Sequence, residues 1–149
     1  MASIISNLST ATIAGLTTRA IAGLTTDDWA AFSSDQIAAL TTTQMAVIPA
    51  ASVSAITASA FAGIETRDLR VLTPAVVRNL TSDQLGALAS DQVGAFTTGQ
   101  IGALTTTQFG SLNAAHISAM TSCQIRALTG AQIGAFTVGQ VNALTADQV

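Results

Sequence analysis

An eight-residue repeat runs through this chain without insertion or deletion. The segment LTSDQLGA at residues 80–87 returns as LASDQVGA at residues 88–95, and the same register extends over residues 8–149. We number each octad from its large apolar residue: apolar at position 1, Thr at 2, Thr or Ser at 3, variable at 4, Gln at 5, Ile or Val at 6, Gly or Ala at 7, and Ala at 8. Because almost the whole chain is repeat, we expect stacked repeat units instead of ordinary globular domains.

Two positions of the octad are apolar in all eighteen copies, namely positions 1 and 6. This predicts two continuous buried rows, and Trp29, which lies in the position 6 row, is interpreted as core filling. Position 8 is mostly Ala or Gly, which indicates a close approach between backbones. Charged residues occur only at positions 2, 4, 5 and 7, so we expect these positions on the solvent side.

Regular extended structures fit this period poorly. In one long α-helix, eight residues advance by about 800°, so the apolar stripe would drift by roughly 80° per copy. In a strand, positions 1 and 6 would face opposite sides unless a turn intervened. A β-solenoid with a turn at Thr-Ser-Asp stays open as the alternative, although Gly and Ala at positions 7 and 8 are poor strand formers.

A short helix in every octad accounts for more of the pattern. Thr-x-x-Gln at positions 2 to 5 is a capping box, and positions 1 and 6 then form the hydrophobic staple that accompanies it. Asp at position 4 lies in the first turn, where the helix dipole favours an anion. Pro74 falls at the first helical position, the site that proline prefers. We therefore predict an all-α solenoid of very short helices, one per octad.

The predicted organisation is a single solenoid over residues 1–149, with a degenerate start at 1–7, divergent repeats at 47–79 and regular repeats at 80–149. In the divergent zone, Pro49 occupies an N-cap site and Val76 a glutamine site. Charges that the rest of the chain avoids are concentrated there. They form either exposed ion pairs, which contribute little to stability, or a contact patch for a partner or neighbouring subunit. The charged residues are Glu65, Arg67, Asp68, Arg70 and Arg78.

Composition argues against several classes of partner. The chain has five basic residues, all arginine, against eight acidic ones, and this net charge of -3 supplies no basic stripe for nucleic acid. Polar positions interrupt every apolar run before the roughly 18 residues that a membrane span needs. Residues 1–7 lack the positive and long apolar regions of a secretory signal, so the sequence leaves localisation open.

The chain offers little that resembles catalytic or metal-binding chemistry. His116 replaces Gln at position 5 and is predicted to imitate its capping role. No second histidine exists to complete a metal site, and Cys123, at the variable position 4, is interpreted as an exposed, incidental thiol. No Gly-rich phosphate-binding motif occurs. We expect no catalytic residues, no metal, no cofactor and no enzymatic activity.

The octads at residues 80–87, LTSDQLGA, and 104–111, LTTTQFGS, are close to the pattern LTTxQ(I/V)xA. This pattern resembles the tandem octapeptide arrays of large bacterial surface or secreted proteins, and the resemblance covers nearly the whole chain. It implies a bacterial, extracellular spacer, stalk or adhesin-like segment.

The expected function is structural: a spacer, a scaffold or the subunit of a self-assembling filament. Neither end carries the polar capping unit that open solenoids usually need. We therefore expect either a fragment of a longer array or ends that meet neighbours head to tail, as a homo-oligomer or filament. The alternative is a surface-binding module in which rows of Thr and Gln contact ice, a polysaccharide or a protein.

Overall fold

A computed structural model describes residues 3–149 of the chain, and residues 1 and 2 of the degenerate start lie outside this range. Over residues 3–149 the chain forms sixteen short α-helices and three 3-10 turns, with no strand. The prediction of an all-α fold is therefore confirmed, and the β-solenoid alternative is wrong. The elements are η1 (Ile5–Asn7), α1 (Thr10–Ala14), α2 (Thr18–Ala22), α3 (Thr26–Ala30), α4 (Ser34–Ala38), α5 (Thr42–Met45), η2 (Val53–Ala55), α6 (Ala58–Phe61), α7 (Thr66–Leu69), α8 (Pro74–Arg78), α9 (Ser82–Ala87), α10 (Ser90–Gly94), α11 (Thr98–Ala103), α12 (Thr106–Gly110), α13 (Ala114–Ala119), α14 (Ser122–Arg126), α15 (Gly130–Gly134), α16 (Val138–Asn142) and η3 (Ala146–Gln148).

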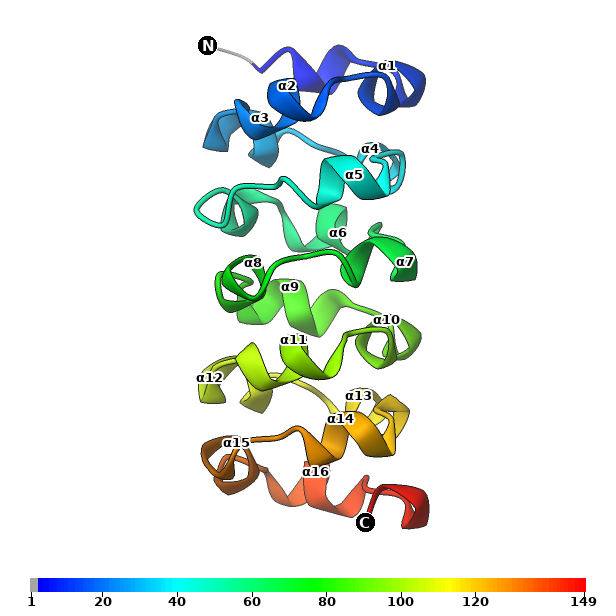
Figure 1. Cartoon of the computed structure of the whole chain (residues 1–149), viewed down its shortest axis with the longest axis vertical. Helices are drawn as coiled ribbons and strands as arrows, with labels where there is room; N and C mark the ends of the chain where they lie inside the picture. Colours follow the sequence, from blue (N-terminus) through cyan, green and yellow to red (C-terminus); the bar gives the residue numbers. More distant parts are fainter. Residues whose placement is uncertain (1–2) are drawn as a thin grey trace.

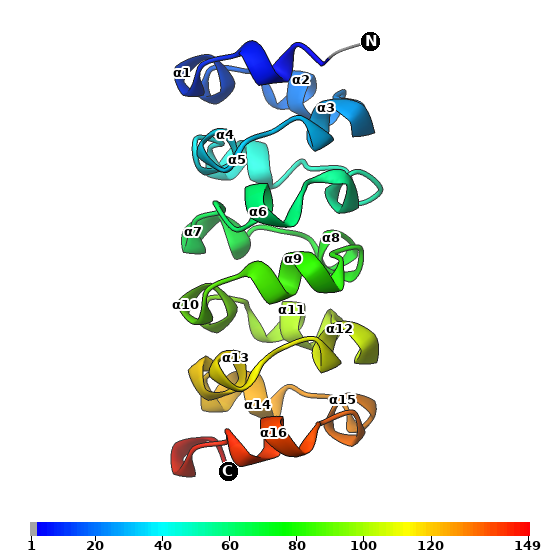
Figure 2. The same ribbon diagram turned by 180° about the vertical axis from the view of Figure 1, so that it is seen from behind.

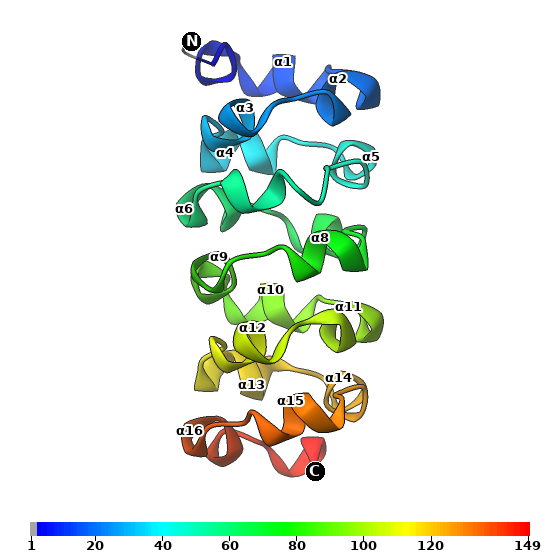
Figure 3. The same ribbon diagram turned by 90° about the vertical axis from the view of Figure 1, so that its left-hand side faces the viewer.

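The helices wind into coils that stack along one long axis, with the two termini at opposite ends (Figure 1). In Figure 1, and from behind in Figure 2, α1, α4, α7 and α10 follow one another down the same side. The view turned by 90° shows the same regular column (Figure 3). Helices that pack against each other across coils are three octads apart along the chain, as α10 and α13 are. The fold is thus a solenoid of short helices.

Most helices start with the predicted capping geometry. In α12 the hydroxyl oxygen of Thr105 accepts the backbone N–H of Gln108 at 3.2 Å, and the side-chain oxygen of Gln108 accepts the backbone N–H of Thr105 at 2.8 Å. α8 begins at Pro74, as predicted. The octad that carries Pro49 is an exception to one α-helix per octad. Because proline offers neither a hydroxyl nor an N–H, that octad forms only the 3-10 turn η2.

The helices end without left-handed residues, since no residue among 3–149 has a positive φ. Two of the glycines at positions 7 and 8 lie at close contacts between coils, whereas Gly86, Gly110 and Gly134 face open space. A Cβ atom on Gly94 would lie 2.8 Å from the carbonyl oxygen of Ala119 in the next coil. A Cβ on Gly63 would collide with the backbone of Ser34. The predicted close approach between backbones is therefore present at these sites.

In the inner coils, positions 1 and 6 fill the interior of the solenoid, as predicted, whereas Ile133, Val141 and Val149 at position 6 are exposed. Trp29 is fully buried and stacks on Phe32, with ring centroids 4.9 Å apart. Burial of each large apolar side chain contributes roughly 1.5–3 kcal/mol, so the two rows supply most of the driving force for stacking. One part of the pattern was interpreted wrongly: position 5, which was assigned to the solvent side, is buried wherever it holds glutamine.

Candidate functional site

The feature that joins the coils is a row of buried glutamines, which we call the glutamine ladder. All ten glutamines of the chain occupy position 5, and their exposed fractions lie between 1 and 8%. Buried amides of this kind are normally hydrogen-bonded on both their oxygen and their nitrogen. The ladder consists of Gln36, Gln44, Gln84, Gln92, Gln100, Gln108, Gln124, Gln132, Gln140 and Gln148.

Gln100 shows the bonding pattern of the ladder. Its Oε1 accepts the backbone N–H of Thr97 at 2.8 Å, which closes the capping box of α11. Its Nε2 donates to two backbone carbonyls of the preceding coil, Leu69 and Leu72, both at 2.7 Å. One side chain therefore caps its own helix. It also supplies hydrogen-bond donors to two carbonyl oxygens of the linker between two helices of the preceding coil.

The same bridge recurs in every member of the ladder. Each Nε2 donates to the carbonyl 28 residues earlier at position 1, at distances of 2.6–2.8 Å. Most also reach the carbonyl 31 residues earlier. The position 1 carbonyl belongs to the octad three before that of the glutamine, which agrees with the three-octad spacing of helices packed across coils.

The bridge explains why position 5 holds Gln and not Glu. A capping box accepts either residue, and the helix dipole favours a negative charge in the first turn. Yet no octad of this chain has Glu at position 5. A carboxylate could accept from the N-cap amide, but it has no proton to donate to the carbonyls of the coil above. The sequence analysis missed this donor role; the absence of Glu from position 5 is the signal that could have indicated it.

His116 reproduces both functions of glutamine with its two ring nitrogens. Nδ1 accepts the backbone N–H of Asn113 at 3.2 Å, and Nε2 lies 2.8 Å from the carbonyl oxygen of Leu88, the position 1 carbonyl that a glutamine would reach. This arrangement requires the neutral tautomer with its proton on Nε2. The predicted capping role of His116 is confirmed, and its Nε2 also continues the ladder between Gln108 and Gln124.

The ladder is interrupted for one coil in the divergent zone. There, position 5 holds residues that cannot donate two N–H groups to the coil above: Ser52, Ala60, Asp68 and Val76. The position 1 carbonyl oxygens that glutamines at these sites would reach accept no hydrogen bond from any residue in the described part of the chain; they belong to Leu24, Phe32, Leu40 and Ile48. Coil contact here relies on apolar packing, on the close approach of Gly63 to Ser34 and on a hydrogen bond from the Thr42 hydroxyl to Asp68.

The structure divides the predicted charged patch. Glu65 and Arg67 form an exposed ion pair at 2.8 Å, and Arg70 and Arg78 are also exposed. Asp68 is fully buried: its Oδ1 accepts the hydroxyl of Thr42 at 2.7 Å, and its Oδ2 has no hydrogen-bond partner within residues 3–149 but lies 3.6 Å from Nε of Arg67, in ion-pair range. Because Asp68 occupies the glutamine site of its octad, it belongs to the coil interface and not to the outer surface.

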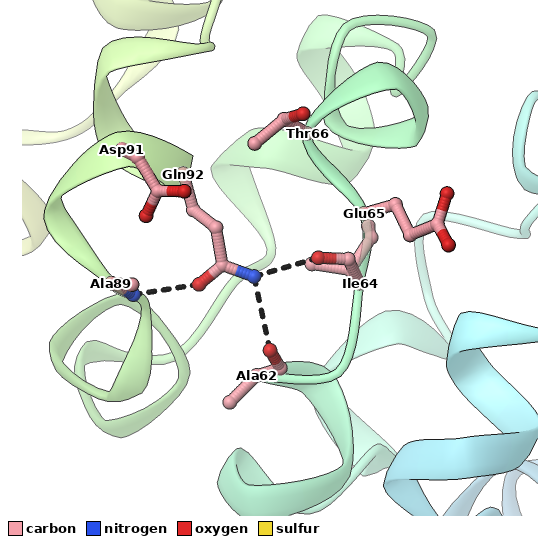
Figure 4. Close-up of a pocket in the computed structure, with 7 residues that line it drawn as sticks. All are labelled: Ala62, Ile64, Glu65, Thr66, Ala89, Asp91 and Gln92. Carbon is pink, nitrogen blue, oxygen red and sulfur yellow. Dashed lines mark hydrogen bonds between the residues drawn. The ribbon is translucent and has the colours of Figure 1, made fainter.

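A surface pocket of about 430 Å³ lies where α10 stacks on the start of α7 (Figure 4). Ala89 takes the N-cap position there, so the backbone N–H of Gln92 has no side-chain oxygen to bond. Gln92 nevertheless makes its bridges, to Ala62 at 3.0 Å and Ile64 at 2.6 Å. The pocket lies beside the ladder at the octad that lacks the N-cap threonine, with Glu65 and Asp91 among its lining residues.

At the first coil an aspartate replaces the glutamine. The carboxylate of Asp28 accepts the hydroxyl of Ser3 at 2.7 Å, and the hydroxyl and backbone N–H of Thr25 at 2.8 and 3.0 Å. The Ser3 hydrogen bond, followed by those from Thr25, lowers the pKa of Asp28 below the ordinary value of an aspartate. Asp28 therefore caps α3 as an anion without offering a donor.

Cys123 and the residue types that bind metals are the remaining candidates from the sequence. The Cys123 thiol is exposed. In the part of the chain that the structure describes, no three His, Cys, Asp or Glu side chains gather at a distance that would hold a metal ion. None of the helices in residues 3–149 is both long and apolar enough to cross a bilayer.

Comparison with known families finds a match for the repeat unit. Residues 61–98 and 117–149 match the ALTTAQ repeat. The two matched segments contain both the divergent octads around α7 and regular octads with ladder glutamines, so the ALTTAQ repeat spans both kinds of unit. This agrees with the predicted tandem array, whereas a bacterial surface origin stays a prediction. No curated protein and no solved structure matches the chain.

Proposed function

We propose that this tandem repeat protein acts as a structural spacer or scaffold, without catalysis. The observation that carries the proposal is the glutamine ladder, which ties each coil to the one before it along most of the long axis. Such bonds hold neighbouring coils at a fixed register, so the distance between the two ends follows from the number of octads.

The alternative of a binding surface made of Thr and Gln rows has less support. The ladder glutamines are buried, so a ligand cannot contact a row of them. The hydroxyl oxygens of the position 2 threonines, such as Thr97 and Thr121, already accept a backbone N–H in the helix caps. An ice or polysaccharide surface would have to use the exposed position 3 side chains. Thermal hysteresis or glycan-array binding by the intact chain would favour this alternative.

Distance measurements between two spin labels test the spacer proposal. The exposed thiol of Cys123 provides one site, and the substitution Thr10→Cys on the exposed side of α1 provides the other. A rigid spacer predicts one narrow distance distribution that stays unchanged when the ionic strength rises. A broad distribution in the folded protein would contradict a spacer role.

A further inference from the structure

His116 continues the glutamine ladder with a side chain that can change its charge near neutral pH. The side-chain amide of a glutamine neither gains nor loses a proton under such conditions, so the ten ladder glutamines keep their acceptor and their donors. Histidine is the side chain whose ordinary titration falls between pH 5 and 8. Because His116 is the single histidine of the chain, a proton can alter the bonding of the ladder near neutral pH at this position alone.

The two hydrogen bonds of the His116 ring require its neutral form. Nδ1 accepts the backbone N–H of Asn113, and Nε2 donates to the carbonyl oxygen of Leu88 in the preceding coil. Protonation would place a second N–H on Nδ1, directly opposite the N–H of Asn113. The hydrogen bond that closes the capping box of α13 would then be lost, and two donors would face each other at the start of the helix.

The surroundings of the ring do not compensate a positive charge. His116 is only 2% exposed, so an imidazolium would lose nearly all its contact with water. No carboxylate within residues 3–149 lies in ion-pair range of the ring, and the nearby Nδ2 of Asn113, 3.5 Å from Nε2, is a donor. Among the elements that contact α13, α10 carries Asp91 and η3 carries Asp147, both exposed, and α16 carries no charged residue. The closed contact therefore accommodates the neutral ring and disfavours the charged one.

We propose that His116 makes the contact between α10 and α13 acid-sensitive, in a ladder whose glutamines do not titrate. When this contact opens, the ring enters water, where a histidine binds a proton near about pH 6.5. Because the closed contact accepts only the neutral ring, proton binding favours the open form, and the contact weakens as the pH falls through this range. This inference concerns the pH response of one coil contact and is independent of the spacer role.

The substitution His116→Gln tests the proposal, because it introduces the residue that the ladder carries elsewhere and removes the titratable group. Hydrogen exchange by mass spectrometry at about pH 7.5 and about pH 5.5, corrected for intrinsic exchange rates, measures the protection of the amides of α13 in both chains. The protection in the original chain, relative to the variant, should fall about tenfold from the higher to the lower pH, the limit for a closed contact that binds no proton. Peptides from α4 and α5, in coils remote from His116, serve as the reference and should behave alike in the two chains.

A second measurement needs no substitution. NMR of the imidazole nitrogens in the original folded chain, at about pH 6, should show the neutral ring with its proton on Nε2. An imidazolium in the folded protein at this pH would overturn the proposal. So would a protection of α13 that depends on pH equally in the original chain and in His116→Gln, or one that rises in acid only in the original chain.

Discussion

At the scale of the residue, the fold depends on a side chain that combines one acceptor and two donors on a reach of three single bonds. Gln108 uses its Oε1 for the N–H of Thr105 and its Nε2 for carbonyls of Val77, Arg78 and Leu80. Replacement by Glu keeps the shape and the acceptor but removes both donors. It also leaves a buried charge facing carbonyl oxygens.

We therefore expect Gln108→Glu to lower the free energy of unfolding by about 3–5 kcal/mol at neutral pH. The matched control is Thr107→Glu, which adds the same charge on the exposed neighbouring residue of the same helix start and should change stability by less than about 0.5 kcal/mol. Urea unfolding followed by circular dichroism measures both. Equal effects of the two substitutions would show that the amide donors contribute nothing.

At Asp68 a substitution can add the ladder donors instead of removing them. The Oδ2 of Asp68 is buried without a hydrogen-bond partner among residues 3–149, with only the exposed Arg67 in ion-pair range at 3.6 Å. The carbonyl oxygens of Ile37 and Leu40 occupy the places in the coil above to which a ladder glutamine would donate. Asp68→Gln should place an amide on these carbonyls and raise the free energy of unfolding by about 1–3 kcal/mol. Asp68→Asn, which removes the charge but is too short to bridge, separates the two contributions. A lower urea midpoint for Asp68→Gln would contradict this interpretation of the interruption.

At the scale of the element, each helix is too short to be stable in isolation, so the hydrogen bonds of its N-cap contribute a large part of its stability. α10 lacks this cap, because Ala89 has no oxygen for the N–H of Gln92. Ala89→Thr should restore the capping box, fill part of the adjacent pocket and stabilise the protein by about 1 kcal/mol. Ala89→Val has nearly the same shape without the acceptor, so equal thermal stabilities of the two variants would exclude the cap as the cause.

The cap of α3 should make the first coil sensitive to acid. Hydrogen bonds from Ser3 and Thr25 lower the pKa of Asp28 in the folded protein. The stabilisation is therefore present above the pKa of an unfolded aspartate, and it is lost as the pH falls through the lower folded value. Asp28→Asn should reduce the loss of thermal stability between neutral and strongly acidic pH. A carboxyl resonance of Asp28 that titrates at or above the ordinary aspartate value would contradict the hydrogen-bond pattern.

The elements were largely predictable because their signals are local. The Thr-x-x-Gln box, the Asp in the first turn and Pro74 each mark a helix start within a few residues. Burial of the glutamines was not predicted, because Asp28 and Asp68 share position 5 with them and suggested a solvated site. The partner carbonyls lie in the preceding coil, more than three octads away along the chain, which no local pattern indicates. The octad with Pro49 forms no α-helix, because proline at the N-cap has neither the side-chain oxygen nor the backbone N–H that a capping box uses.

At the scale of the whole molecule, the number of hydrogen bonds between neighbouring coils differs from one part of the solenoid to another. Between residues 84 and 148 every octad has a glutamine or His116 at position 5, whereas the four octads at 48–79 have none. The coil interface formed by Ser52, Ala60, Asp68 and Val76 therefore lacks bridging amides, and the Leu40 carbonyl has no donor within the described chain. This interface is expected to be the weakest plane of the stack.

Hydrogen exchange by mass spectrometry should detect that plane. Backbone amides of α3 to α7, on both sides of it, should open with a free energy at least about 1 kcal/mol lower than those of α9 to α13. The substitution Asp68→Gln should reduce the difference. Uniform protection along the column, or stronger protection at 24–79, would show that apolar packing compensates fully for the missing amides.

The most direct test of the account is the exchange of the glutamine side-chain amide protons with solvent, measured by NMR on uniformly labelled protein. All ten glutamines are buried and bonded to carbonyls of the preceding coil, whereas the exposed Asn142 side chain has no hydrogen bond within the described residues and serves as the internal reference. We expect the Nε2 protons of the ladder to exchange far more slowly than those of Asn142. Glutamine protons that exchange as fast as the asparagine reference would mean that the coils are not joined by these amides.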